Sequence, residues 1–162
     1  MMTKNDFYEL VMQAYKPAES MIRMVRADKL DWRPGPKFMS LGQVICHLAY
    51  GIGTDFRSLV TGKWPTADEM TEGMKPENLP SCSAEEALEK LQKDRTTLRE
   101  VLDSVSETEF NEKVVSVPWG WQAKMDGMAV LFREHFTNHK MQLFTYLKLL
   151  DLPVNTETLY GG

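Results

Sequence analysis

Apolar residues recur at spacings of three and four along most of this 162-residue chain. That period places side chains on one face of an α-helix. It predicts four long amphipathic helices, over about residues 5–26, 40–61, 83–105 and 126–150. Ser40 and Ser83 are suited to cap two of them, and Glu86 completes a capping box with Ser83. Because no convincing sheet is predicted, we expect an all-α fold, a four-helix bundle.

The connections between these helices constrain how the bundle is wound. Residues 63–81 form a long connection with three prolines, Pro65, Pro76 and Pro80. A loop of this length in a compact domain is often a lid or a pocket wall. Residues 110–124 have little helical signal and are predicted to be partly extended. We therefore expect long crossover connections within one domain spanning residues 1–162, and a kink in the first helix at Pro17.

Composition excludes several classes of function. The net charge of −4 and the pI near 5.4 argue against a general nucleic-acid-binding protein. No secretory signal is evident, and no apolar run approaches the roughly 20 residues that span a membrane. Cys46 and Cys82 are too few for a disulfide framework, so a cytoplasmic protein is expected. Cys46 is interpreted as a small buried apolar side chain, and Cys82 as a thiol whose pKa a helix terminus could lower.

The three histidines of the chain are its strongest functional signal. His135 and His139 are four residues apart on the apolar face of the last predicted helix, so their Cβ atoms should lie roughly 5–6 Å apart. His47 lies at the edge of the apolar stripe of the second helix. Three imidazoles from two helices would form a metal site with an open position, as in catalytic zinc sites. Alternatively, each histidine is satisfied by its own hydrogen bond, and the spacing alone leaves both interpretations open.

Sequence motifs connect these histidines to a known family. They are Trp32-Arg33-Pro34 in the first loop, residues 40–48 (SLGQVICHL) leading through His47, and residues 135–142 (HFTNHKMQ) followed by residues 146–150 (YLKLL). By these motifs the chain resembles the DinB-like superfamily (damage-inducible, YfiT-type) of metal-binding four-helix bundles, over nearly its whole length. Lys140-Met141 replaces the usual Arg-Gly, and Asp151 stands where glycine is common. Neither departure affects a ligand position.

The resemblance implies a function as well as a fold. His47, His135 and His139 would be the ligands of a divalent metal ion, with zinc or nickel expected most. The family likeness implies a homodimer that acts on a small-molecule substrate or a thiol. The composition argues against nucleic acid or membrane as a partner. A hydrolase using metal-activated water is the first hypothesis. A transferase or isomerase using a low-molecular-weight thiol is the second, and a non-catalytic metal-binding stress-response protein is the third.

Other residues are candidates for supporting roles. Asp55 could orient a ligand histidine or act as a fourth ligand, or it could simply pair at a helix edge. Gln142 and Tyr146 could line the pocket or make hydrogen bonds between helices. Trp119 and Trp121 could form a pocket wall or a core plug, and Trp64 could belong to a lid or pack against the bundle. No catalytic base is evident, because Glu134 should point about 100° away from His135.

Overall fold

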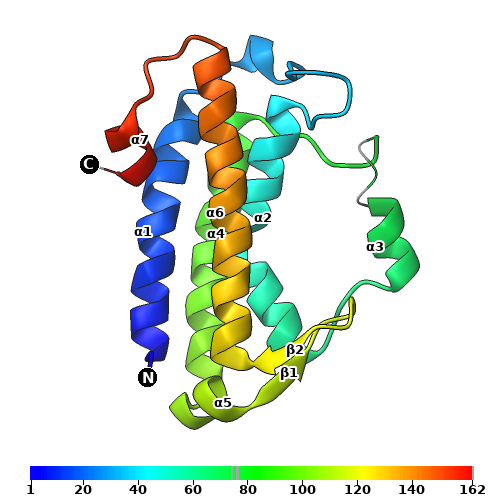
Figure 1. Cartoon of the computed structure of the whole chain (residues 1–162), viewed down its shortest axis with the longest axis vertical. Helices are drawn as coiled ribbons and strands as arrows, with labels where there is room; N and C mark the ends of the chain where they lie inside the picture. Colours follow the sequence, from blue (N-terminus) through cyan, green and yellow to red (C-terminus); the bar gives the residue numbers. More distant parts are fainter. Residues whose placement is uncertain (74, 76, 162) are drawn as a thin grey trace.

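The computed structural model describes every residue except Met74, Pro76 and Gly162, so Pro76 of the predicted long connection lies outside the described residues. Its long helices are α1 (Lys4–Arg23), α2 (Leu41–Thr61), α4 (Ala84–Ser104) and α6 (Met125–Leu149). They run side by side along the long axis of the molecule (Figure 1). The predicted all-α four-helix bundle is therefore confirmed.

The winding of the bundle follows from its two long connections. Helices α1 and α6 run in one direction, whereas α2 and α4 run in the other (Figure 1). The α2–α4 connection contains a short helix that was not predicted, α3 (Ala67–Gly73), which stands apart from the bundle. The α4–α6 connection contains α5 (Glu107–Glu112) and an antiparallel hairpin of β1 (Val114–Ser116) and β2 (Gln122–Lys124), with Val115 opposite Ala123. These segments are the predicted crossovers.

Specific hydrogen bonds fix the starts of α2 and α4 and attach the C-terminal helix to α6. Ser40 caps α2 with Gln43, and Ser83 caps α4 with Glu86, each in a reciprocal capping box. A 3₁₀ turn (Ala27–Lys29) follows α1, which continues as one helix through the buried Pro17. The C-terminal helix α7 (Thr156–Tyr160) is tied to α6, because the buried Lys140 Nζ donates to the Leu159 carbonyl at 3.0 Å.

Helix α2 is interrupted at Gly51, whose φ of 65° and ψ of 174° are not helical. Glycine suits this position because a side chain there would be strained and would collide with Asp94 of α4. The Asp94 carboxylate then accepts hydrogen bonds from the backbone N–H groups of Gly53 (2.8 Å) and Thr54 (2.7 Å). It thereby caps the second half of α2 in the way that an N-cap side chain does. The break divides α2 into two halves, with His47 in the first.

A buried hydrogen-bond network surrounds that break. Tyr15 of α1 donates its hydroxyl to Asp94 at 2.6 Å and accepts from the Ile52 N–H at 2.8 Å. The Thr54 hydroxyl also donates to Asp94, at 2.7 Å. We call these interactions of Asp94 with Tyr15, Gly53 and Thr54 the carboxylate knot. It joins α1, α2 and α4 in the interior, where each hydrogen bond to a charged group is worth about 1.5–3 kcal/mol.

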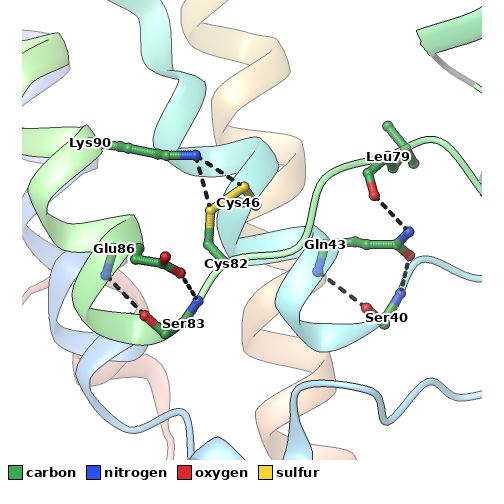
Figure 2. Close-up of a disulfide and its surroundings, with 8 residues drawn as sticks. All are labelled: Ser40, Gln43, Cys46, Leu79, Cys82, Ser83, Glu86 and Lys90. Atoms are coloured by element: carbon green, nitrogen blue, oxygen red, sulfur yellow. Dashed lines mark hydrogen bonds between the residues drawn. A yellow bond between two sulfur atoms is a disulfide. The ribbon is translucent and has the colours of Figure 1, made fainter.

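A disulfide joins Cys46 of α2 to Cys82, just before α4, with 5.0 Å between the Cα atoms. Figure 2 shows it beside Lys90, whose Nζ lies 3.3 Å from the sulfur of Cys82. The Cys82 N–H also donates to the Gly42 carbonyl, so the end of the α2–α4 connection is fastened to the first half of α2. The interpretation of Cys46 as an unbonded apolar side chain, and of Cys82 as a thiol, is therefore wrong. The expected cytoplasmic location was based on unpaired cysteines, and the disulfide removes that basis.

The core lies between the four long helices and continues under α5. Tyr15, Phe7, Phe56 and Phe110 are its largest fully buried side chains, and the last three meet with ring centroids 5.9–6.1 Å apart. None of the described helices is long and apolar enough to cross a membrane.

Candidate metal centre

The three histidines come together between α2 and α6. One ring nitrogen from each of His47, His135 and His139 lies within 4.8 Å of the other two. The Nε2 atoms of His47 and His135 are 3.1 Å apart, and the ring centroids are separated by 4.3–5.3 Å. The i,i+4 spacing on α6 supplies two of the rings, and the first half of α2 supplies the third. The predicted convergence of the three side chains is thus present.

The group is more open than the sequence suggested. His135 is exposed, and His47 and His139 are half-buried, although the pattern on the last helix had placed His135 and His139 within a buried face. The histidines are therefore accessible to a small molecule.

The environment favours neutral imidazole rings. Burial, reinforced by the neighbouring His139 and His135, lowers the pKa of His47 to about 4. Burial likewise lowers the pKa of His135, with a smaller contribution from His139. A neutral ring carries the nitrogen lone pair that a metal ion requires, so the lowered pKa values of His47 and His135 favour metal binding.

A chain of hydrogen bonds fixes the orientation of His139. Tyr146 donates its hydroxyl to the Met39 carbonyl at 3.0 Å and so accepts from Gln142 Nε2 at 3.2 Å. The other amide atom, Gln142 Oε1, then faces His139 Nδ1 at 2.8 Å and must accept its proton. This tautomer leaves Nε2 of His139 as the unprotonated nitrogen. Gln142 and Tyr146 thus support the histidine group, as ligand histidines in metal sites are commonly supported.

Asp55 lies outside the histidine group. It is in the second half of α2, beyond the break at Gly51, and the group among the described residues consists of the three histidines without a carboxylate. Burial, with repulsion from Asp94, raises the pKa of Asp55 to about 7. Its strongest electrostatic neighbour is therefore the carboxylate knot. Glu134 is exposed on α6, in agreement with its expected place on a solvated face.

The tryptophans form a cluster that sequence reasoning recognised only in part. Trp119 and Trp121, in the turn between β1 and β2, are 48% and 59% exposed, so they are not a core plug. Trp64, from the α2–α4 connection, meets Trp119 with ring centroids 5.4 Å apart. Trp64 also contacts Phe132 of α6, at 6.4 Å. The contact between Trp64 and Trp119 joins two loops 55 residues apart and has no local signal in the sequence.

Sequence reasoning also missed Asp94, although a signal was present. Asp94 lies between Leu91 and Leu98 at helical spacing, on the face where α4 is otherwise apolar. A carboxylate in such a stripe must be paired when buried, and it is 3% exposed. The pairing could be anticipated, whereas its partners on α1 and α2 could not.

The donor set fits a divalent metal ion. Three neutral imidazole nitrogens suit zinc, nickel or copper, and they leave a coordination position unfilled by protein. The rings converge from two rigid helices, and one of them has its outer nitrogen fixed by Gln142. The three histidines could therefore hold such an ion, whose identity the donor set does not select.

Comparisons with known proteins agree with this architecture. The sequence profile of the DinB superfamily matches residues 16–142. A DinB-like protein from Bacillus cereus has a similar structure, with a TM-score of 0.74, 18% identity, and coverage of 95% of this chain and 97% of the other. A proposed DinB family member from Exiguobacterium sibiricum has a TM-score of 0.71 at 20% identity, over 98% and 99% of the two chains.

A third solved structure, a DinB-like protein from Bacillus subtilis, has a TM-score of 0.67 at 13% identity and covers 91% of this chain and 95% of the other. At these identities the likeness establishes the fold alone. No curated protein matches the chain.

Proposed function

Since this chain belongs to the DinB superfamily, and its three histidines converge at an accessible point, we propose that it is a metal-dependent hydrolase of a small molecule. His47, His135 and His139 would hold the metal ion. The observation that carries the proposal is the composition of the group, which is three neutral nitrogen donors with no protein carboxylate or thiolate among the described residues. Such a set leaves the ion its full charge and an open position.

A divalent ion in this position would supply hydroxide at neutral pH, because it lowers the pKa of bound water to about 7. The residues of the chain supply the rest. The helices hold His135 and His139 one turn apart, and Gln142 keeps the proton of His139 on Nδ1. The exposure of His135 gives substrate a route to the group.

The proposal does not include a protein base. Glu134 is exposed on α6, and Asp55 lies beyond the α2 break. A metal ion that generates hydroxide itself has less need of a base for the first proton. We therefore expect a single apparent pKa in the acidic limb of the pH–rate profile, which belongs to the water.

The test is an activity screen of untagged protein loaded with zinc or nickel, against a panel of model esters and amides. Each substrate is assayed with the loaded wild type, the metal-stripped wild type and a His139→Ala variant. A matched control is Asn138→Ala, an exposed neighbour on α6. We expect hydrolysis that needs metal, persists in Asn138→Ala and falls at least 100-fold in His139→Ala.

The same screen separates the competing functions. A parallel set of reactions contains a low-molecular-weight thiol and an electrophilic substrate. Turnover that requires the thiol would indicate a transferase and not a hydrolase. A tightly metal-loaded protein without turnover in either set would favour a binding protein.

A further inference from the structure

Three clustered tryptophans form an apolar surface at the hairpin end of α6. We call Trp64, Trp119 and Trp121 the tryptophan wall, and Leu131 of α6 is a further exposed apolar side chain. Trp119, Trp121 and Leu131 are 48%, 59% and 36% exposed, and Trp64 is half-buried. Aromatic side chains of this size bury 150–250 Å² when covered, so such exposure leaves a large part of their hydrophobic surface in water.

The wall is a built structure and not a set of loose side chains. Trp64 packs edge-to-face on Trp119, at 5.4 Å and 79°, and Trp119 packs the same way on Trp121, at 6.4 Å and 79°. The buried Phe132 supports Trp64 from behind, at 6.4 Å. The hairpin turn that presents two of the rings is closed by hydrogen bonds between Val117 and Trp121 and between Gly120 and Val117. The rings are therefore held in place before any ligand arrives.

Phe132, which contacts Trp64, connects the wall to the histidine group along α6. Leu131 and Phe132 precede His135 by four and three residues on α6, so they lie one turn away, about 5.4 Å along the same side of the helix. Met128, one turn further along that side, is 1% exposed, because here the helix is covered. Exposed apolar side chains therefore lie on the hairpin side of His135.

The opposite side of the histidines has a different character. Beyond His139, the same side of α6 presents the amide of Gln142 and the hydroxyl of Tyr146, which are hydrogen-bonded to each other. The Arg33 guanidinium is close enough to lower the pKa of Tyr146, against the larger raising effect of burial. Along α6 the histidines therefore have the tryptophan wall on one side and a hydrogen-bonded polar pair on the other.

From this juxtaposition we propose that the ligand of the histidine centre carries an apolar group, an aryl ring or a branched hydrocarbon, which packs on the tryptophan wall while its polar reacting end lies at the histidines. The inference rests on the proposed function and adds the substrate class to it. Ligand sites generally combine apolar lining with a few polar groups that fix orientation, which is the arrangement seen along α6.

The test uses chelating probes that differ only in the arm. Acetohydroxamate, 4-phenylbutanohydroxamate and 4-aminobutanohydroxamate present the same metal-binding head with no arm, an apolar arm and a charged arm. Dissociation constants for zinc-loaded protein are measured by calorimetry, and tryptophan fluorescence reports contact with the rings. Trp119→Ala removes the exposed centre of the wall, and Trp119→Phe retains an aromatic ring. Tyr160→Ala on α7 removes an exposed aromatic side chain elsewhere.

We expect the phenyl arm to bind at least tenfold tighter than the amino arm and to change the tryptophan emission. In Trp119→Ala this preference should fall below threefold while the affinity for acetohydroxamate is unchanged. Trp119→Phe should retain part of the preference and Tyr160→Ala all of it.

Two results would overturn the inference while leaving the metal centre intact. One is equal affinity for the two arms when acetohydroxamate still binds. The other is a dimer that Trp119→Ala converts to monomer in sedimentation without altering arm preference, which would assign the wall to an interface. If none of the three probes binds the zinc-treated protein, the proposed function fails and the inference falls with it.

Discussion

Helix α2 contributes to two clusters of ionisable side chains, one on each side of Gly51, and the clusters differ in how their polar atoms are satisfied. In the carboxylate knot, Asp94 is 3% exposed and accepts from four donors, two on the backbone and two on side chains. In the histidine group, Nε2 of His47 faces Nε2 of His135 at 3.1 Å, and one ring nitrogen of each histidine points to a common place. A cluster that satisfies itself stabilises the fold. A cluster of imidazole nitrogens that point to one place, and that cannot all be satisfied by hydrogen bonds to one another, is suited to bind a ligand such as a metal ion.

The largest effect expected from this contrast is on stability. Asp94→Ala leaves the donors of Tyr15, Gly53 and Thr54 without their acceptor, and each unsatisfied buried group costs about 1–3 kcal/mol. Relief of the buried carboxylate offsets part of that cost. We expect the free energy of unfolding in urea to fall by about 3–5 kcal/mol.

The matched control is Asp103→Ala, which removes an exposed carboxylate paired with Arg99 on the same helix and should cost less than about 1 kcal/mol. At a temperature where Asp94→Ala remains folded, zinc affinity should stay within about threefold of wild type. A loss of metal binding as large as that of a ligand variant would contradict the separation of the two clusters.

Asp55 provides a second test, because its carboxylate is buried and is repelled by the carboxylate of Asp94. Its pKa rises from 3.8 to about 7 in the folded protein, through burial and then Asp94, so the folded state holds a proton that the unfolded state releases. The contribution of Asp55 to the free energy of unfolding is fully present below about pH 3.8 and is lost as the pH rises through 7. The shift corresponds to about 4 kcal/mol at most.

Asp55→Asn should accordingly stabilise the protein at pH 8 by about 2–4 kcal/mol relative to its effect at pH 4. Chemical denaturation of both proteins across this pH range measures the difference. A variant whose effect on stability does not depend on pH would show that Asp55 is ionised in the folded protein at neutral pH.

Gln142 tests the histidine side of the contrast with a smaller effect. Gln142→Leu removes the acceptor that holds the proton of His139 on Nδ1. Loss of such a supporting group typically costs 10–100-fold in metal affinity. Competition titration with a chromophoric zinc chelator measures the change, and Asn138→Leu on the exposed side of α6 is the control. If both variants bind zinc as tightly as wild type, the hydrogen-bond chain from Met39 to His139 has no role in the site.

The parts predicted from sequence are those set by local patterns. Ser40 and Ser83 mark the starts of α2 and α4 because capping involves residues within one turn. His135 and His139 are neighbours because α-helical geometry alone requires it. The resemblance to the DinB superfamily added His47, which local spacing could place at a helix edge but could not pair with α6.

The parts that sequence missed depend on contacts between distant segments. Gly51 falls inside the helix predicted over residues 40–61, and its positive φ is understood only with Asp94 packed against it. The Cys46–Cys82 disulfide needs the α2–α4 connection to return to the bundle. The Trp64–Trp119 contact needs the β1–β2 hairpin to lie beside the end of α2.

The central claim is that the histidine group binds one divalent ion per chain, and metal stoichiometry tests it most directly. Untagged protein is stripped with a chelator, incubated with zinc at pH 7, desalted and assayed by elemental analysis beside its His139→Ala variant. We predict about one equivalent of zinc per chain in the wild type, and affinity at least 100-fold weaker in the variant. Less than about a tenth of an equivalent in the reloaded wild type, or equal retention by both proteins, would contradict the account.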